Sequence, residues 1–277
     1  MIPVLFRIPE WIPLAGGQAI TSFGALLLVA FLAGGKLFAD GVRADDLEAR
    51  GWDLVITAAV AGLLGAKAMH LAVNGLLGLP TGLGRAGLDW FGGLAFGGAA
   101  LLWHARVQGL DPGRVAAAAA APVALGYAIG RVGSFLVGSE YGVPTTLPWG
   151  VAFPAGHPPT TPANLLAAFG LETPAGALCG DFARVHPTQL YEAVLSLGVF
   201  AAVRRARHAR TDPRGGGWWV AGLFLILHGA ARVLVEPVRA KADGLAGPVT
   251  VDLVLAAGVV VLGAGLQAWR GANRGKD

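Results

Sequence analysis

Long runs of apolar residues recur along this sequence and alternate with short polar connections. A hydrocarbon core about 30 Å thick needs about 20 mostly apolar residues in an α-helix, so runs of this length predict membrane-crossing helices. Seven spans are predicted: Ala15 to Gly35, Leu54 to Leu76, Leu88 to Trp103, Val115 to Val137, Pro187 to Val203, Gly217 to Val238 and Pro248 to Leu266. The pattern predicts an all-α, polytopic membrane helical bundle, with residues 1–277 as a single integral membrane domain.

The composition agrees with this pattern. Hydrophobic residues make up 55% of the 277 residues and charged residues only 14%, against roughly a quarter in soluble domains. The longest connection, Gly138 to His186, is rich in proline and glycine and is expected to form a small head between spans four and five. Cys179 is the only cysteine, so an internal disulfide and a cysteine-based metal site are excluded.

The basic residues lie at the ends of apolar runs and form no stripe with interleaved aromatic residues, so the formal charge of +4 indicates membrane topology and not nucleic-acid binding. Retained Lys and Arg mark the cytoplasmic side of a membrane. One side of the predicted bundle holds most loop cations: Lys36, Arg43, Arg50, Arg106, Arg114, Arg204, Arg205, Arg207, Arg210, Arg214, Arg270, Arg274 and Lys276. The other side holds Arg7, Arg85, Arg184, Arg239 and Lys241. We therefore expect the N-terminus and the head on the outer side and the C-terminus in the cytoplasm.

An ionised group inside a predicted span is expected to have a structural or functional role, because placing it in a membrane helix costs about 2.5 to 3.5 kcal/mol. Arg131 is such a group, within the segment Gly130 to Gly142, where small residues allow helices to approach closely. Its planar guanidinium can bind a phosphate, with Ser134, Ser139 and Glu140 as nearby partners. The structural alternative is that Arg131 reaches the membrane interface and pairs with Glu140 at the helix end.

The sixth span carries four polar side chains that share one face of a continuous helix. They are His228, Arg232, Glu236 and Arg239, at positions i, i+4, i+8 and i+11. A polar stripe in lipid must face the interior of the bundle, and ionisable residues there are most often functional. The structural alternative is an ion pair between Arg232 and Glu236 that only fixes helix packing.

The fifth span begins with a cluster of polar and aromatic side chains beside the predicted head. The cluster comprises His186, Gln189, Tyr191 and Glu192, and Pro187 suits the first turn of a helix. His186 is a candidate general base. A hydrogen bond at the start of the helix is an equally good interpretation of a lone histidine.

Together these segments resemble the prolipoprotein diacylglyceryl transferases. Gly130 to Gly142 resembles the signature of that family, His186 to Glu192 resembles its H-P-x-Q-L-Y-E element, and Gly222 to Arg239 is similar to its penultimate span. The predicted spans, the outward N-terminus and the outer head agree with the fold that the resemblance implies. It also implies a multi-pass protein of the bacterial inner membrane, with a periplasmic N-terminus.

The chain departs from the resembled pattern at several positions. Phe91 stands where many members carry a histidine, before the paired glycines of the third span, and Phe23 stands where members often carry a tyrosine. Ser134 replaces the usual asparagine of the signature, and Ser139 is an additional residue before Glu140. These changes affect the proton-transfer step that the resemblance implies. Arg131 and Arg232 are both retained. The alternative class is a non-catalytic paralogue or a transporter that binds anionic lipid.

The resemblance implies that the sn-1,2-diacylglyceryl group of phosphatidylglycerol is moved to the lipobox cysteine thiol of a prolipoprotein signal peptide. A thioether forms and glycerol phosphate is released, among membrane lipids and without metal, cofactor or nucleic acid. Arg131 and Arg232 are then expected to hold the lipid phosphate. The implied catalytic residues are Arg131, Arg232, Glu236, His186 and Glu140, and the implied substrate-binding residues are Arg131, Ser134, Gly142, Gln189, Tyr191, Glu192 and Arg239.

Overall fold

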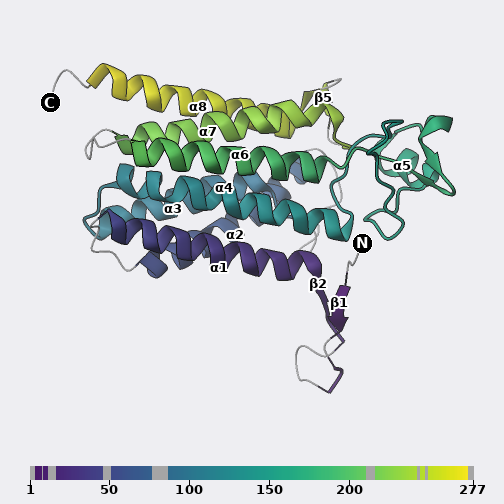
Figure 1. The fold of residues 1–277 in the computed structure, drawn as a ribbon, viewed down its shortest axis with the longest axis horizontal. Coiled ribbons are helices and arrows are strands. Elements are labelled where there is room, and N and C mark those ends of the chain that lie inside the picture. The colour runs from purple at the N-terminus through teal and green to yellow at the C-terminus, as the bar shows by residue number, and fades with distance from the viewer. Residues whose placement is uncertain are drawn as a thin grey trace. The chain divides into compact units, whose positions relative to one another are not determined.

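The computed structural model describes residues 4–7, 9–11, 17–45, 51–76, 87–209, 216–241, 244–246 and 249–273 (Figure 1). Its long helices are α1 (Ser22–Ala44), α2 (Gly51–Leu76), α3 (Trp90–Val107), α4 (Pro112–Val137), α6 (Thr188–Ala209), α7 (Gly216–Val235) and α8 (Val251–Asn273). The shorter elements are β1 (Val4–Arg7), β2 (Ala19–Thr21), α5 (Pro162–Phe169), η1 (Ala175–Ala177), β3 (Leu178–Cys179), β4 (Phe182–Ala183), η2 (Glu236–Val238), β5 (Gly244–Ala246) and β6 (Val249–Thr250). The strands pair in antiparallel order as β1–β2, β3–β4 and β5–β6.

The mostly helical fold that the sequence predicts is confirmed. Among the described residues, five helices are long and apolar enough to cross a membrane, namely α1, α2, α4, α7 with its extension to Val238, and α8. The third and fifth predicted spans form the helices α3 and α6, which are not among these five, so the count of seven spans stays a prediction. The chain is a multi-pass membrane protein.

The first predicted span is displaced from the helix that forms. Helix α1 begins seven residues after Ala15, where Thr21 Oγ1 accepts a hydrogen bond from the amide of Gly24 at 3.1 Å, as a helix N-cap does. The helix also continues beyond the apolar run, through an ion pair of 2.8 Å between Lys36 and Asp40. Opposite charges four residues apart stabilise a helix. The predicted end of the first span at Gly35 is therefore wrong, because α1 continues to Ala44.

Some predicted features lie outside the described residues. They are the first residues of spans one and seven, Ala15 and Pro248, and the loop cations Arg50, Arg85, Arg210, Arg214, Arg274 and Lys276. The orientation of the chain depends in part on these cations and stays a prediction.

The chain divides into two compact units, each described here by itself. Unit 1 comprises Met1–Leu32, Ala124–Gly198 and Ala230–Leu253. Unit 2 comprises Ala33–Val123, Val199–Gly229 and Val254–Asp277. Helices α1, α4, α6, α7 and α8 each contribute residues to both units.

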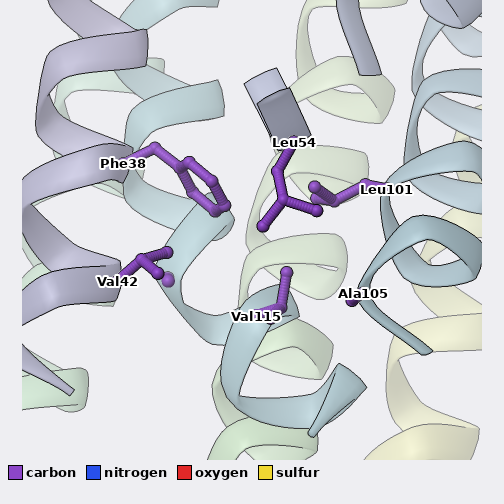
Figure 2. Packing of buried hydrophobic residues seen from close by; sticks show 7 residues of the cluster. Phe38, Val42, Leu54, Leu101, Ala105 and Val115 are labelled. Carbon is purple, nitrogen blue, oxygen red and sulfur yellow. The ribbon is translucent and has the colours of Figure 1, made fainter. Parts of the chain in front are cut away.

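Unit 2 is held together by an apolar core and by glycines that let helices touch. A Cβ added to Gly65 on α2 would lie 2.3 Å from Cβ of Phe96 on α3, and a Cβ added to Gly92 would lie 2.5 Å from the carbonyl oxygen of Gly65. Small residues therefore set the distance between these two helices. The core side chains come from α1 to α4 and are Phe38, Val42, Leu54, Leu101, Ala105, Val115 and Ala118 (Figure 2).

The head segment, residues 138–186, contributes most of an apolar core within unit 1. Helix α5 lies in this segment (Figure 1) and has well-defined ends. The side chain of Thr161 caps its first turn, Pro162 occupies the first helical position, and Gly170 ends it with a left-handed φ of 66°. The buried core residues are Tyr141, Phe153, Leu165, Ala183, Val185 and Ala240. The proline- and glycine-rich composition thus encodes a folded segment.

Backbone hydrogen bonds connect the start of the head segment to its last residue and to η2. The amide of Gly142 donates to the carbonyl of His186 at 2.8 Å, and the amide of Val143 donates to the carbonyl of Val238 at 2.9 Å. A Cβ added to Gly142 would lie 2.3 Å from the Val238 oxygen and 2.7 Å from Cβ of His186. Only glycine fits between these segments, which fixes the loop that follows α4.

The α-helix of the sixth span ends at Val235, and a 3₁₀ turn follows as η2. Pro237 lies in this turn, and a proline cannot donate the backbone hydrogen bond that would continue an α-helix. Arg239 then has an extended backbone with φ of −85° and ψ of 141°. The predicted continuous helical face from His228 to Arg239 is therefore wrong, because Arg239 has left the helix.

Candidate active site

Glu192, in the second turn of α6, is the centre of a buried charged network in unit 1. Its Oε2 accepts from Arg131 Nε at 2.5 Å and from the hydroxyl of Tyr127 at 2.8 Å. Its Oε1 accepts from Arg239 Nη1 at 3.0 Å and from Arg232 Nη1. One carboxylate thus bridges three guanidinium groups that come from α4, the end of α7 and the residue after η2.

Arg131, near the end of α4, is buried and held on two sides. Its Nε binds Glu192, and its Nη1 forms an ion pair with Glu140. Its guanidinium carbon also lies 4.8 Å from the centre of the Tyr127 ring, a cation–π contact. The predicted pairing with Glu140 is present, but the side chain of Arg131 lies within the protein and does not extend to the surface.

Glu140 reaches Arg131 from an unusual backbone conformation. Its φ is +58°, in the left-handed region that non-glycine residues rarely adopt. Thr188 Oγ1 donates to the carbonyl of Glu140 at 3.0 Å, and Gln189 Nε2 donates to the carbonyl of Ser139 at 2.7 Å. The start of α6 therefore holds this loop in place. The nearby Arg131 guanidinium lowers the pKa of the Glu140 carboxyl, which keeps the carboxyl ionised.

Arg232 on α7 is held by a second set of carboxylates. Its Nη2 donates to Asp252 Oδ2 at 3.0 Å and lies 3.7 Å from Glu236 Oε2. Lys241 Nζ lies 3.0 Å from Glu236 Oε1 and also pairs with Asp252, while Thr250 Oγ1 donates to Glu236 Oε1 at 2.5 Å. Glu236 therefore contacts Arg232 as the sequence suggested.

Sequence reasoning missed Asp252 and Lys241. Arg239, which the sequence placed on one helical face with Arg232, donates to Glu192. A usable signal for Asp252 existed, because it is an acidic residue in the first turn of the apolar helix α8. Lys241 carried no such signal, since a lysine just beyond a span is ordinary.

His186 lies in a separate group of hydrogen bonds at the edge of the head segment. Its Nδ1 is 3.2 Å from the hydroxyl of Tyr191, which accepts a hydrogen bond of 2.8 Å from Trp149 Nε1. Burial lowers the pKa of His186, so the ring is neutral at pH 7. Among the described residues, the side-chain hydrogen bond of His186 is with Tyr191 and not with a guanidinium group.

The other predicted site residues lie at defined positions. Ser134 is buried on α4, and its carbonyl accepts from the amide of Ser139 at 3.0 Å. Gln189 is fully buried, and its Oε1 has no hydrogen-bond partner within the described residues. His228 belongs to unit 2, where it accepts a hydrogen bond from Trp90 Nε1 at 2.8 Å. Of the four residues of the predicted polar stripe, Arg232, Glu236 and Arg239 thus join the charged network of unit 1.

The network can bind an anion, because guanidinium groups from different helices point their donors into one buried region. Carboxylates hold these donors in position, which is the preorganisation that stabilises negative charge in a dry site. Within the described ranges, no three or more His, Cys, Asp or Glu side chains come together as metal ligands.

The fold and the site define a polytopic helical membrane protein with charge-paired arginines buried among its helices. A family model described as prolipoprotein diacylglyceryl transferase matches residues 9–269. The chain belongs to this family of transferases, which confirms the resemblance seen in the sequence.

Individual relatives carry the name phosphatidylglycerol–prolipoprotein diacylglyceryl transferase. The protein from Stenotrophomonas maltophilia (strain R551-3) is 34% identical over 80% of this chain and 77% of its own length. The protein from Xylella fastidiosa (strain 9a5c) is 31% identical, covering 94% of this chain and 90% of the relative. A protein from Vibrio vulnificus (strain CMCP6) is 30% identical over 65% of this chain and 60% of its own length.

Proposed function

We propose that this chain transfers the diacylglyceryl group of phosphatidylglycerol to the lipobox cysteine of a prolipoprotein. The observation that carries the proposal is the pair of buried arginines, Arg131 and Arg232, joined through the single carboxylate of Glu192. Two guanidinium groups held in this way can bind one phosphate through charge-assisted hydrogen bonds. Membership of the family indicates the reaction, and the arginine pair can bind the phosphate of the lipid substrate.

The reaction exchanges a carbon–oxygen bond for a carbon–sulfur bond. The cysteine sulfur attacks the glycerol carbon that bears the phosphate, and the bond from that carbon to the phosphate oxygen breaks. The bonding electrons leave with the oxygen as glycerol phosphate, and the thiol proton passes to a base. A free cysteine thiol has a pKa of about 8.5, and neighbouring cations favour its thiolate form. Negative charge therefore grows on the departing phosphate, where Arg131 and Arg232 stabilise it.

The candidate proton acceptors are Glu140 and His186. Glu192 is already bound by three guanidinium groups and by Tyr127, so its role is to position the arginines. Glu140 is exposed and contacts Arg131, whereas His186 contacts Tyr191. These contacts favour Glu140, with Gln189 and Tyr191 lining the region where the substrates meet.

The distribution of loop cations supports a periplasmic location for the site. We place the chain in the bacterial inner membrane with seven spans, α3 and α6 being added to the five apolar helices. The N-terminus and the head segment then face the periplasm, and the C-terminus faces the cytoplasm. Prolipoproteins that have crossed the membrane meet the head segment first, and phosphatidylglycerol reaches the arginines from the surrounding lipid.

The test is transfer of labelled diacylglyceryl from phosphatidylglycerol to a lipobox peptide by the detergent-purified protein. Loss of one preorganised donor to a developing oxyanion costs about 10²- to 10³-fold in rate. Arg131→Ala and Arg232→Ala are expected to lower transfer by at least that factor, because each removes a whole guanidinium. The matched control is Arg204→Ala, which removes an exposed arginine from the far end of α6 and leaves transfer unchanged.

Two results would contradict the proposal. Normal turnover by Arg131→Ala or Arg232→Ala would show that the arginines do not hold the phosphate. A wild-type protein that binds labelled phosphatidylglycerol but releases no glycerol phosphate in the presence of peptide would be a lipid-binding paralogue and not an enzyme.

A further inference from the structure

The charged network of unit 1 is electrically balanced without a substrate. Every member forms at least one ion pair with another member. Among the described residues, its cations are Arg131, Arg232, Arg239 and Lys241, and its carboxylates are Glu140, Glu192, Glu236 and Asp252. A lipid phosphodiester brings one more negative charge, and an uncompensated buried charge is strongly unfavourable. Release of one carboxylate from the network would restore the balance when the phosphate arrives.

The carboxylates differ sharply in how easily they can leave. The side chains of Glu192 and Glu236 are each 3% exposed, and that of Asp252 is 18% exposed. Each of these three accepts from at least two cationic or hydroxyl groups. Glu140 is 44% exposed, and its one ion pair within the described residues is with Arg131. Water can replace the lost contact at Glu140, but not at the other three.

Departure of Glu140 would leave Arg131 oriented to receive the phosphate. Its Nε stays bound to Glu192 at 2.5 Å, and its guanidinium stays over the Tyr127 ring. The Nη1 that now binds Glu140 would become available on the side from which Glu140 approaches. The fork geometry of the guanidinium allows both ends to be used independently.

The backbone around Glu140 can remain in place while the side chain turns. Thr188 and Gln189 hold the carbonyls of Glu140 and Ser139, and neither bond involves the Glu140 carboxylate. The left-handed conformation of Glu140 is therefore maintained by the loop and α6, and not by the ion pair. Rare backbone conformations that the surroundings maintain are characteristic of functional sites.

We propose that Glu140 occupies the phosphate-binding position on Arg131 in the empty protein and is displaced by the phosphate of the incoming lipid. The inference rests on the proposed function. It adds that an internal carboxylate competes with the substrate and keeps the arginine paired between reaction cycles. Displacement also moves the carboxylate into water near Arg131, where it can accept the thiol proton.

The first test is equilibrium binding of labelled phosphatidylglycerol to the purified protein in micelles of an uncharged detergent. Glu140→Gln keeps the shape of the side chain and removes the competing charge, so we expect its dissociation constant to fall about tenfold or more. The matched control is Glu172→Gln, which removes an exposed carboxylate of the same head segment and leaves the constant unchanged. Diacylglycerol, which lacks the phosphate, is expected to bind wild type and both variants alike. Equal or weaker phosphatidylglycerol binding by Glu140→Gln would overturn the proposal.

The second test uses the unaltered chain, so it does not depend on the folding of a variant. A water-soluble carbodiimide labels exposed carboxylates, and mass spectrometry measures the labelling of Glu140. We expect labelling to rise when phosphatidylglycerol is added and to stay constant when diacylglycerol is added. Unchanged or reduced labelling with phosphatidylglycerol would show that Glu140 stays in place.

The outcomes separate this inference from the proposed function. If the wild-type protein transfers diacylglyceryl to the lipobox peptide but Glu140→Gln binds phosphatidylglycerol no more tightly than wild type, the proposed enzyme activity stands and the displacement of Glu140 is rejected. Tighter binding and increased labelling without transfer would preserve the displacement and reject the enzyme.

Discussion

Replacing Glu192 by glutamine should destabilise the protein more than any other single loss of a carboxylate from the charged network. The side chain is 3% exposed and accepts from three guanidinium groups and one hydroxyl. Glutamine has nearly the same shape, so the change removes charge without leaving a cavity. The three guanidinium groups are then left in a buried region with their common counter-charge gone.

The magnitude follows from the burial of these partners. Removing one member of a buried ion pair costs about 3 to 5 kcal/mol, because the other member stays buried and uncompensated. At about 2 °C per kcal/mol for a chain of this size, the midpoint of thermal unfolding should fall by roughly 6 to 10 °C. Transfer should also fall by about 10²-fold, since the arginines lose the group that positions them.

The assay is thermal unfolding of the detergent-purified protein, with Glu140→Gln as the matched control. That variant makes the same chemical change at the exposed end of the same network. Because Glu140 is 44% exposed, water can replace part of its contact with Arg131, so the midpoint should fall by clearly less than for Glu192→Gln. Similar midpoints for Glu192→Gln and wild type would refute the view that Glu192 holds the network together.

Three further changes have defined outcomes. Gly142→Ala places a Cβ 2.3 Å from the carbonyl oxygen of Val238, so the midpoint of unfolding should fall by roughly 2 to 6 °C, for an overpacking cost of about 1 to 3 kcal/mol. Gly65→Ala places a Cβ 2.3 Å from Cβ of Phe96 and should lower the midpoint by a similar amount. Thermal unfolding measures both, and an unchanged midpoint would contradict the close contact. The third prediction concerns pH. The Arg131 guanidinium lowers the pKa of the Glu140 carboxyl below its ordinary value of 4.5. The ion pair between them therefore stabilises the protein fully above pH 4.5, and this stabilisation is lost as the pH falls through the lowered pKa. The midpoint difference between wild type and Glu140→Gln should therefore disappear in acid, and a difference that grows in acid would contradict this assignment.

The positions of the helices could be predicted because the apolar runs are long and the bilayer fixes the length they need. The errors occur where other forces decide the ends of helices. Thr21 starts α1 through a cap, Lys36 and Asp40 extend it through an ion pair, and Pro237 ends α7. None of these effects depends on hydrophobicity.

The candidate site could be predicted in its members but not in its contacts. Arg131 and Arg232 stood out because a charge within an apolar run requires a partner. The sequence could not show that Glu192 is the partner of both, since α4, α6 and α7 meet only in the folded chain. Asp252 lies in the first turn of the apolar helix α8, which marks it as a candidate, but only its contact in the folded chain identifies Arg232 as its partner.

The division of the network among several helices has a consequence for how the protein is made. Helix α4 carries Arg131 and is synthesised before α6, which carries Glu192. Each helix emerges from the ribosome with a charge that costs about 2.5 to 3.5 kcal/mol in lipid until its partner arrives. Helix α6 is also not among the five helices that are apolar enough to cross a membrane in the described chain. The insertion machinery should therefore retain α4 until α6 has been synthesised, so that the nascent chain enters the bilayer as paired helices and not one helix at a time.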